Sequence, residues 1–379
     1  LIQSEYREVK AKSKSSMDFS IAEQKNYNSK SHLFAKSKRI LNFNNFDESE
    51  IKLKLELVSD DTYLKTYNIQ SPLITNDNLL RSNIGVSASR EDLSLESNIY
   101  VYEDLSKPAS DRYEFIYPDY KLEKKLENNF DTYGDLFINS SGYLKNYSTN
   151  IFEQVVVNDL IFNSNTVFTN SGLKNEYNFK LTNINTNSKN STNYENERDH
   201  QLLSIAEFNS SYPLEKIGIK YDGTLIPMLS LRYSPNSTKN NKNEDRRIDI
   251  NNIFSFNRLG KSDSVEGGAS LTYGSEYFVS NKLDRKIFSA KLANNLRLEE
   301  EEKLPQNSYL GKKTSDFVAN LKYDPNDFFN INYDFSINEN LSDTSYQKLD
   351  SEIKINNFVT TFSYLNENNT INDQTYIYN

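Results

Sequence analysis

Apolar and polar residues alternate with a period of two along much of this chain. The clearest example is residues 328–340, FFNINYDFSINEN, in which the apolar residues share one parity and the polar residues share the other. The apolar members are Phe329, Ile331, Tyr333, Phe335 and Ile337, and the polar members are Asn330, Asn332, Asp334, Ser336 and Asn338. Because successive side chains of a β-strand point to opposite faces, this pattern predicts a strand with one apolar face and one polar face.

The same period recurs along the chain and predicts half-buried strands wherever it appears. The further stretches are residues 51–60, 83–90, 228–235, 268–278, 316–325 and 358–367. Between the strands lie short polar links, such as 324–327, and long ones, at 185–200, 234–247 and 298–316. This predicts a meander with two unlike ends. At about 20 residues for each strand and its link, the chain would hold on the order of 18 strands.

The apolar face of these strands could meet either a protein core or a lipid bilayer. A soluble sandwich of this size should contain strands that are apolar on both faces, or helices that cover the sheet. Here the second face is polar almost everywhere, and no apolar run is long enough for a transmembrane helix. In a membrane barrel, lipid lies outside, water lies inside, and closure removes exposed edges. The predicted fold class is therefore all-β, a large antiparallel transmembrane β-barrel, with a soluble β-rich protein as the alternative.

The pattern gives no sign of a second domain. No stretch keeps a helical apolar spacing for two turns, and no fixed-length repeat suggests a propeller or solenoid. Residues 1–379 are therefore predicted to form one barrel domain. Pro227, Pro235 and Pro325 are expected at strand edges, where a missing N–H is tolerated. Because the chain begins at Leu1 and ends within an alternating run, we expect both ends to be cuts through a longer protein.

Composition narrows the function classes. Aromatic residues make up 13% of the chain although its mean hydropathy is only −0.74, a mixture that suits strands rather than disorder. The net charge of −9 argues against a nucleic-acid partner, which would require neutralisation of phosphates. There is no cysteine, so the sequence offers no disulfide framework and no thiolate chemistry.

Candidates for catalysis and metal binding are few. His32 and His200 do not have a two-histidine metal spacing, and both are expected to be solvated or lumenal. Residues 311–314, GKKT, lack the earlier glycine of a phosphate loop and are interpreted as a basic loop. The run Glu299–Glu302 is expected to be a solvated loop rather than a cation site. The sequence therefore predicts no enzyme, no cofactor and no metal.

Three stretches go beyond composition, at residues 58–68, 212–236 and 251–274. The first contains Ser59, Asp60, Tyr63 and Leu64; the second contains Pro213, Pro227, Arg232, Tyr233 and Pro235; the third contains Asn257, Arg258, Gly260, Asp263, Glu266, Gly267 and Gly268. In this order and spacing they resemble the β-barrel portion of LptD, the lipopolysaccharide-assembly family also called OstA or Imp. The third stretch is the most specific, because it is similar to the family segment N-R-x-x-G-x-D-x-x-E-G-G.

The resemblance implies an outer-membrane translocon of a Gram-negative bacterium that inserts lipopolysaccharide into the outer leaflet. The complete protein would receive lipopolysaccharide from an LptA-like bridge through a periplasmic N-terminal domain, and a barrel of about two dozen strands would be plugged by an LptE-like lipoprotein. Sugars would cross a hydrated lumen, and lipid would leave by a lateral gate between the terminal strands. By this comparison the chain is a mid-barrel fragment that lacks the periplasmic domain and the gate strands. The family-signature residues would have structural, lumenal roles, such as an ion-pair ladder of Arg258, Asp263 and Glu266.

The leading functional prediction is thus a non-enzymatic conduit for lipopolysaccharide. Another outer-membrane barrel, a porin or plugged receptor, is the alternative, and a soluble β-rich binding protein or a barrel hydrolase also stays open. Ile331 is expected to face lipid, and the links 185–200 and 234–247 are expected to be exposed outside the cell. Lys52, Lys54 and Lys322 are predicted to lie on the polar, inward face. Their positive charge is expected to offset the net negative charge of the chain, which would otherwise repel an anionic cargo.

Overall fold

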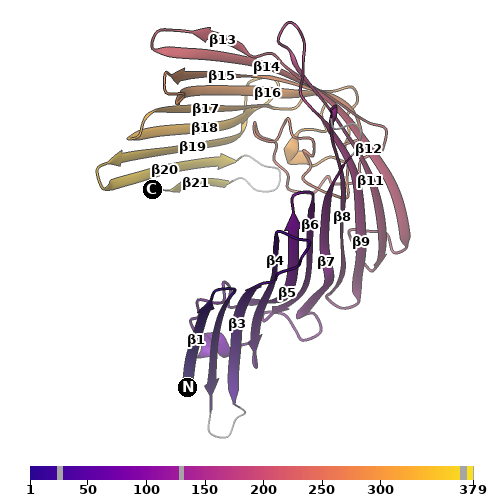
Figure 1. Ribbon diagram of the computed structural model, residues 1–379, viewed down its shortest axis with the longest axis vertical. Coiled ribbons are helices and arrows are strands. Elements are labelled where there is room, and N and C mark those ends of the chain that lie inside the picture. Colours follow the sequence, from indigo (N-terminus) through magenta and orange to yellow (C-terminus); the bar gives the residue numbers. More distant parts are fainter. Residues whose placement is uncertain (24–28, 128–131, 368–373, 379) are drawn as a thin grey trace. The chain divides into compact units, whose positions relative to one another are not determined.

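A computed structural model of the chain describes residues 1–23, 29–127, 132–367 and 374–378 (Figure 1). The strands belong to one 21-stranded antiparallel sheet. Up to residue 211 they are β1 (Ile2–Lys10), β2 (Ser13–Ala22), β3 (Lys30–Ile40), β4 (Glu48–Val58), β5 (Leu79–Arg90), β6 (Leu93–Asp104), β7 (Tyr113–Leu126), β8 (Gly134–Tyr147), β9 (Ile151–Ser164), β10 (Val167–Phe168), β11 (Lys174–Lys189) and β12 (Arg198–Ser211). The remainder are β13 (Leu214–Ile217), β14 (Tyr221–Ser234), β15 (Gly268–Asn281), β16 (Lys286–Arg297), β17 (Phe317–Asn326), β18 (Phe329–Ile337), β19 (Thr344–Ile355), β20 (Phe358–Glu367) and β21 (Gln374–Tyr378).

Helix is almost absent from the described part of the chain. It comprises the four-residue α1 (Tyr63–Thr66) and the short 3-10 helix η1 (Gln306–Ser308). The chain divides into two compact units, which are described separately. The first comprises Leu1–Asn128, Leu136–Ile161 and Thr182–Leu202, and the second comprises Asn129–Asp135, Phe162–Leu181 and Leu203–Asn379. The all-β prediction is confirmed, and the strand number exceeds the expected one partly because β10 and β13 are very short.

The two faces predicted from the period of two are present. In the second unit, Asn320 of β17 lies opposite Asp334 of β18, which in turn lies opposite Lys348 of β19. The next row joins Leu321, Tyr333 and Leu349 on the other face. Cross-strand neighbours share a face in an antiparallel pair, so the residues of one row all point to the same side of the sheet. We call the face that carries Asn320 and Asp334 the inner face of the second unit, and the opposite face its outer face.

The links at the two ends of the strands differ in length, as predicted. In the first unit, two residues join β1 to β2 and β5 to β6, whereas residues 59–78 join β4 to β5. In the second unit, two residues join β17 to β18 and β19 to β20, whereas residues 235–267 and 298–316 join β14 to β15 and β16 to β17. In an antiparallel meander, alternate links lie at opposite ends, so the long segments share one end of each unit.

The long polar links are exposed only in part, and their place outside the cell stays a prediction. Half of residues 185–200 belong to β11 and β12, and residues 190–197 form the link between them. Within 234–247, Thr238 and Asn241 are buried, because this segment folds back against its own sheet. Asn241 donates a hydrogen bond to Ser264 Oγ at 2.9 Å, and its backbone N–H donates to the Lys303 carbonyl at 2.8 Å.

The prolines also lie deeper in strands than expected. Pro235 directly follows β14, but Pro227 lies inside β14 and Pro325 lies inside β17. Each interior proline coincides with a break in strand pairing: β12 ends and β13 begins opposite Pro227, and the β17–β18 register shifts at Pro325. The Pro227 carbonyl accepts from the Tyr212 N–H at 3.1 Å, so the missing N–H of Pro227 points toward the same break. This is how a strand interior tolerates proline.

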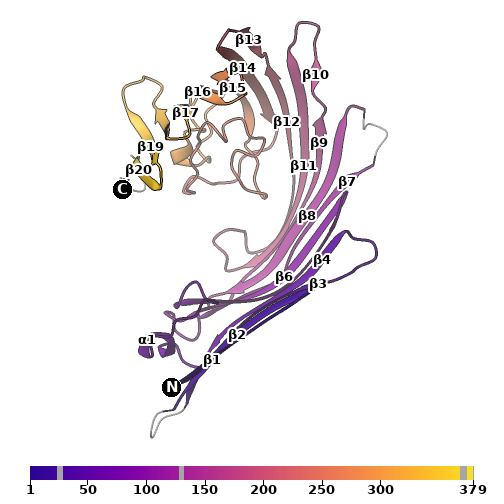
Figure 2. The same ribbon diagram turned by 60° about the vertical axis from the view of Figure 1, so that its left-hand side comes forward.

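In the first unit, the segment 59–78 covers part of one sheet face with its own apolar cluster. Tyr63 and Leu64 of α1 are buried together with Phe34 of β3 and Leu80 of β5. Figure 2 shows α1 beside the ends of β1 and β2. Asp60 supports the turn that precedes the helix, because its carboxylate accepts from the Thr62 hydroxyl at 2.7 Å and pairs with Lys30 at 2.9 Å.

A buried polar cluster fixes α1 to the strands beneath it. The Tyr63 hydroxyl lies 2.7 Å from Ser20 Oγ, which lies 2.6 Å from His32 Nδ1, and His32 Nε2 lies 3.3 Å from Asp18 Oδ1. All four side chains are almost fully buried. The expectation that His32 is solvated was therefore wrong, because Tyr63 covers it. A serine, a histidine and an aspartate meet here, but their burial leaves no room for a substrate, so the cluster has a structural role.

Replacing Tyr63 with Phe should test that role. The change removes one of the two hydrogen-bond partners of the buried Ser20 hydroxyl, which keeps His32, so we expect it to lower the free energy of unfolding by about 1 kcal/mol. Tyr67→Phe is the matched control, because the nearby Tyr67 hydroxyl is buried without a hydrogen-bond partner among the described residues and its loss should cost little. Chemical denaturation with both variants measures the difference. Equal effects of the two changes would show that the Ser20 contact contributes nothing.

Candidate functional site

The inner face of the second unit carries two long segments, residues 235–267 and 298–316, which we call the inner insert. Its apolar residues form a core with the strands beneath, made of Ile248, Ile250, Ile253, Leu259, Leu304 and Leu310 from the insert and Ala293 and Val318 from the sheet. Figure 1 shows these segments folded against the strands on one side. The insert is therefore a packed element rather than a pair of solvated loops.

Beneath the insert lies a buried ionic network centred on Glu266. Arg258 Nε donates to Glu266 Oε2 at 2.9 Å, and its Nη2 donates to Oε1, so this pair is bidentate. Arg297 of β16 donates to the same carboxylate at 2.6 Å, and Arg232 of β14 lies 3.4 Å away. Paired planar groups of this kind combine strong charge-assisted hydrogen bonds with a fixed geometry.

The remaining donors of the network tie the insert to four strands. Arg232 donates to Glu207 of β12 at 2.5 Å and to the Ser255 carbonyl of the insert at 2.6 Å. Arg258, which belongs to the insert, donates to Thr272 of β15 at 2.9 Å and to Asn295 of β16 at 2.7 Å. Strands β14, β15 and β16 thus bind the insert directly through this network, and β12 joins it through the pair of Glu207 with Arg232.

The electrostatics of the network favour the charged state of each partner. Burial would raise the pKa of Glu266, but the three guanidinium groups outweigh it and lower that pKa to about 2. Burial lowers the pKa of Arg258 to about 10, against the attraction of Glu266, so this side chain also stays charged at neutral pH. Charges buried in this way are stable only as a complete set, because removal of one partner leaves another charge without compensation.

The structure separates the family-signature residues of the third stretch into three roles. Arg258 and Glu266 pair in the network, whereas Asp263 pairs with Lys239 at 2.7 Å and lies outside it. Asn257 closes a turn of the insert, because its side chain accepts from the Gly260 N–H at 3.1 Å and donates to the Lys261 carbonyl at 2.9 Å. These contacts place the residues but do not show their functional roles.

The two adjacent glycines bring the insert close to the sheet. A Cβ atom on Gly267 would lie 2.3 Å from the Asn236 carbonyl oxygen, so only glycine fits there. Gly268, the first residue of β15, has φ of +79°, which other residues rarely adopt. The glycine pair therefore lets the chain turn from the insert into β15 directly after Glu266.

The other signature residues lie at strand ends and pairing breaks. Pro213 lies between β12 and β13, and the Arg232 side chain joins the network. In the first unit, Ser59 Oγ accepts from the Ser31 N–H at 2.7 Å and so pins the segment that leads to α1. This first stretch belongs to the first unit and the ionic network to the second unit.

The sequence did not identify Glu207, Arg297, Thr272 or Asn295 as members of this site. Glu207 and Arg297 are charged residues on the inner face of otherwise alternating strands, which is a signal that could have marked them. Their partners could not be found without the strand register, since Arg297 reaches Glu266 from a different strand.

No group of three or more metal-ligating side chains is found among the described residues. In the same part of the chain, no helix has the length and apolar character needed to cross a membrane.

An antiparallel meander with an exposed apolar face, a polar inner face and an insert fixed to the inner face is typical of outer-membrane β-barrel transport proteins. The model of the LptD family, described as LPS transport system D, matches residues 29–379. The chain therefore belongs to the LptD family, whose members are outer-membrane components of lipopolysaccharide transport in Gram-negative bacteria. A search of curated proteins found no match for this chain.

Replacing Glu266 with Gln should release the insert. The change leaves three buried guanidinium groups facing Glu207 alone, and breaking a buried pair costs about 3–5 kcal/mol. Asp263→Asn is the control, since it removes a partly exposed ion pair worth about 1 kcal/mol or less. Protease cleavage within residues 235–267 should rise sharply in the first variant and little in the second. Similar protection of both variants would show that the network does not hold the insert.

The insert should also respond to acid in a defined range. Because the pKa of Glu266 is lower in the folded protein than in the unfolded chain, its stabilising contribution is fully present above about pH 4.5. This contribution is lost as the pH falls toward 2. Protease protection of residues 235–267, measured with an acid-active protease, should hold at pH 5 and fall steeply between pH 4 and pH 2. Loss of protection already at pH 6 would contradict the assigned charge state.

Proposed function

We propose that this chain forms part of the wall and the lumenal lining of a conduit that inserts lipopolysaccharide into the outer leaflet of the outer membrane. Family membership supports transport of lipopolysaccharide. The polar inner face supports a hydrated path for its sugars and phosphates, because groups that pass along it keep hydrogen-bonding partners. The same membership favours this function over that of a porin, a plugged receptor or a barrel hydrolase.

The inner face of β17, β18 and β19 carries the proposal most directly. Asn320 donates to Asn332 and to Asp334, both at 2.8 Å, and Asn332 donates to Asp334 at 2.7 Å. Asn330 donates to Glu352 at 3.0 Å. Amide groups donate and accept hydrogen bonds, and carboxylates accept them, so these side chains can exchange their hydrogen bonds with one another for hydrogen bonds with sugar hydroxyls.

The positive charges of the inner parity are locally compensated. Lys54 pairs with Glu56, Lys52 pairs with Glu50, and Lys322 lies 3.9 Å from Asp324. These scattered lysines therefore add little uncompensated positive charge toward an anionic cargo. The proposed path binds its cargo weakly along its length, which suits passage rather than storage.

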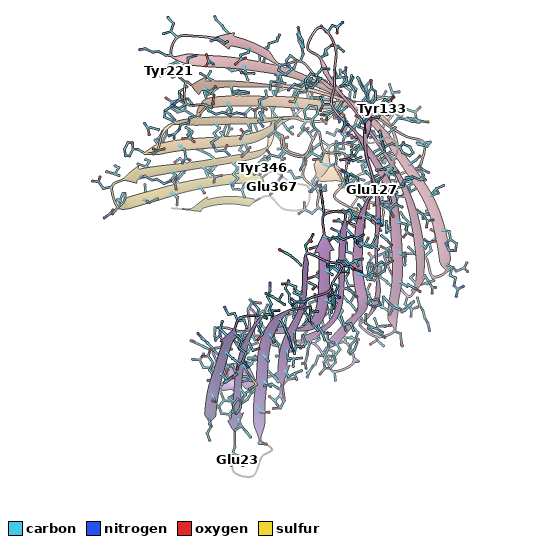
Figure 3. All side chains as sticks on the ribbon, viewed as in Figure 1. Glu23, Glu127, Tyr133, Tyr221, Tyr346 and Glu367 are labelled. Carbon is cyan, nitrogen blue, oxygen red and sulfur yellow. The ribbon has the colours of Figure 1, made fainter. Side chains whose placement is uncertain are left out.

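The inner insert is proposed to narrow the path beside strands β12–β16. Besides the ionic network, Arg247 of the insert binds Glu367 of β20, and its guanidinium carbon lies 4.0 Å from the centre of the Tyr346 ring of β19. Figure 3 shows Tyr346 and Glu367 close together at the ends of their strands. The insert thus has contacts with both early and late strands of the second unit.

The finer parts of the mechanism follow from the family resemblance and are included in the proposal. Lipid would leave through a lateral gate between terminal strands, an LptE-like lipoprotein would plug the lumen, and an LptA-like bridge would deliver lipopolysaccharide through a periplasmic domain. The apolar outer face would lie in the outer membrane, with the long segments toward the cell exterior and the short turns toward the periplasm.

Photo-crosslinking at two adjacent positions tests the conduit. A photoreactive residue at Asn332 should capture lipopolysaccharide while transport runs, and the signal should fade when supply is stopped. At Ile331, on the outer face, capture of membrane lipid should be independent of supply. Absence of lipopolysaccharide capture at Asn332 during active transport would overturn the proposal.

Arginine substitution at the same two positions tests the membrane placement. Ile331→Arg would put a charge into hydrocarbon and should cost about 2–4 kcal/mol near the bilayer midplane, whereas Asn332→Arg would face water and Asp334 and should be mild. Yields of heat-modifiable, membrane-assembled protein measure the difference. Equal tolerance of the two changes would argue against a lipid-facing Ile331.

A further inference from the structure

The outer face of the second unit is hollowed at the end where the inner insert begins. This groove has a volume of about 970 Å³ and runs across strands β11, β12, β14, β15 and β16. Its volume lies at the upper end of the range that holds a well-buried small ligand, about 300–1,000 Å³. Glu207, Arg232 and Arg297 of the ionic network also line the groove, and they pair with one another and with Glu266 of the insert.

The groove arises from one cross-strand row. Tyr233 of β14 lies opposite Ala206 of β12 on one side and opposite Ala269 of β15 on the other. Because the two alanines are short, hollows are left on both flanks of the Tyr233 ring, which is 56% exposed. The next row, which includes Phe208 and Leu271, forms an apolar floor and wall.

One side of the groove is aromatic and the end near the insert is basic. Tyr177 of β11 packs against Phe208 with ring centres 5.1 Å apart. At the other side, Lys313 of the insert lines the groove beside Thr314, which bridges to Leu296 at the end of β16. Lys313 is exposed and makes no ion pair with a described residue. The groove therefore joins an apolar trough to a cationic end, the shape and charge of a site for an anionic amphiphile.

We propose that this groove is a binding site for the lipid A part of lipopolysaccharide, with acyl chains beside Tyr233 and a phosphate at Lys313. This inference rests on the proposed function, which places the insert end of the strands at the outer leaflet. A phosphate suits Lys313 because a lysine ammonium binds it as a point charge. Acyl chains suit the trough because it is apolar and continuous with the lipid-facing surface. The groove would hold a delivered molecule against the outer wall.

Retention of lipid by the purified protein tests the site. The full-length protein is extracted from outer membranes in mild detergent, and bound lipids are identified by native mass spectrometry. The double variant Ala206→Phe/Ala269→Phe, which fills both hollows, should lower retained lipopolysaccharide about tenfold. Lys313→Glu should also lower it. Ala290→Phe is the matched control, because Ala290 lies on the outer face of β16 but does not line the groove.

Three results would overturn the site. They are unchanged retention in the filled variant, an equal loss in the Ala290→Phe control, and retention of phospholipid without lipopolysaccharide. If the filled variant fails to assemble, a photoreactive residue at position 233 is used instead. We then expect it to capture lipopolysaccharide whether or not supply continues, and we expect Lys313→Glu to abolish this capture. Capture unaffected by Lys313→Glu would overturn the site.

Failure of the site and failure of the conduit give different results. Supply-dependent capture at Asn332 together with no specific retention in the groove would overturn the site and leave the conduit intact. Specific retention in the groove with no capture at Asn332 would support the site as a lipid-binding surface and overturn the conduit.

Discussion

Backbone N–H and C=O groups within hydrocarbon must find partners inside the protein, and this constraint underlies the whole structure. Antiparallel pairing of consecutive strands meets it, and pairing in turn fixes which side chains share a face. Because most apolar side chains share one face and most polar side chains share the other, the outer face suits lipid and the inner face suits water. Pro227 and Pro325 lack an N–H and obey the same constraint, because they lie where the strand pairing already breaks.

The polar inner face creates a second requirement. Charged side chains on this face that the inner insert covers need side chains of opposite charge as partners. Arg232, Arg258 and Arg297 meet Glu207 and Glu266 beneath the inner insert, and Glu266 of the insert pairs with both Arg232 and Arg297 of the strands. Because a buried charge without its partner is costly, the insert is held by all of these contacts together. The position of the insert is therefore set by the strands that it contacts.

The sequence predicted the strands and their faces well because a period of two is a local signal. It could not predict what covers a face. His32 is buried because Tyr63, far along the chain, packs over it, and residues 235–267 pack inward because Ile248, Ile250 and Ile253 find a sheet to bury against. These isoleucines directly follow the polar link 234–247 and could have indicated a buried segment. Arg258 and Glu266 were predicted from family resemblance, but Glu207 and Arg297 required the register that only the fold supplies.

Along each strand, every second residue is expected to contact hydrocarbon, and the residues between them are expected to contact water. Since the chain has no cysteine, single cysteines can be introduced at each position from 329 to 337 and spin-labelled in the membrane-assembled protein. Collision rates with oxygen, which concentrates in lipid, and with a water-soluble nickel chelate should then oscillate with a period of two and opposite phase, with oxygen highest at Phe329, Ile331, Tyr333, Phe335 and Ile337. Rates without this period, or with both reagents in phase, would contradict the account.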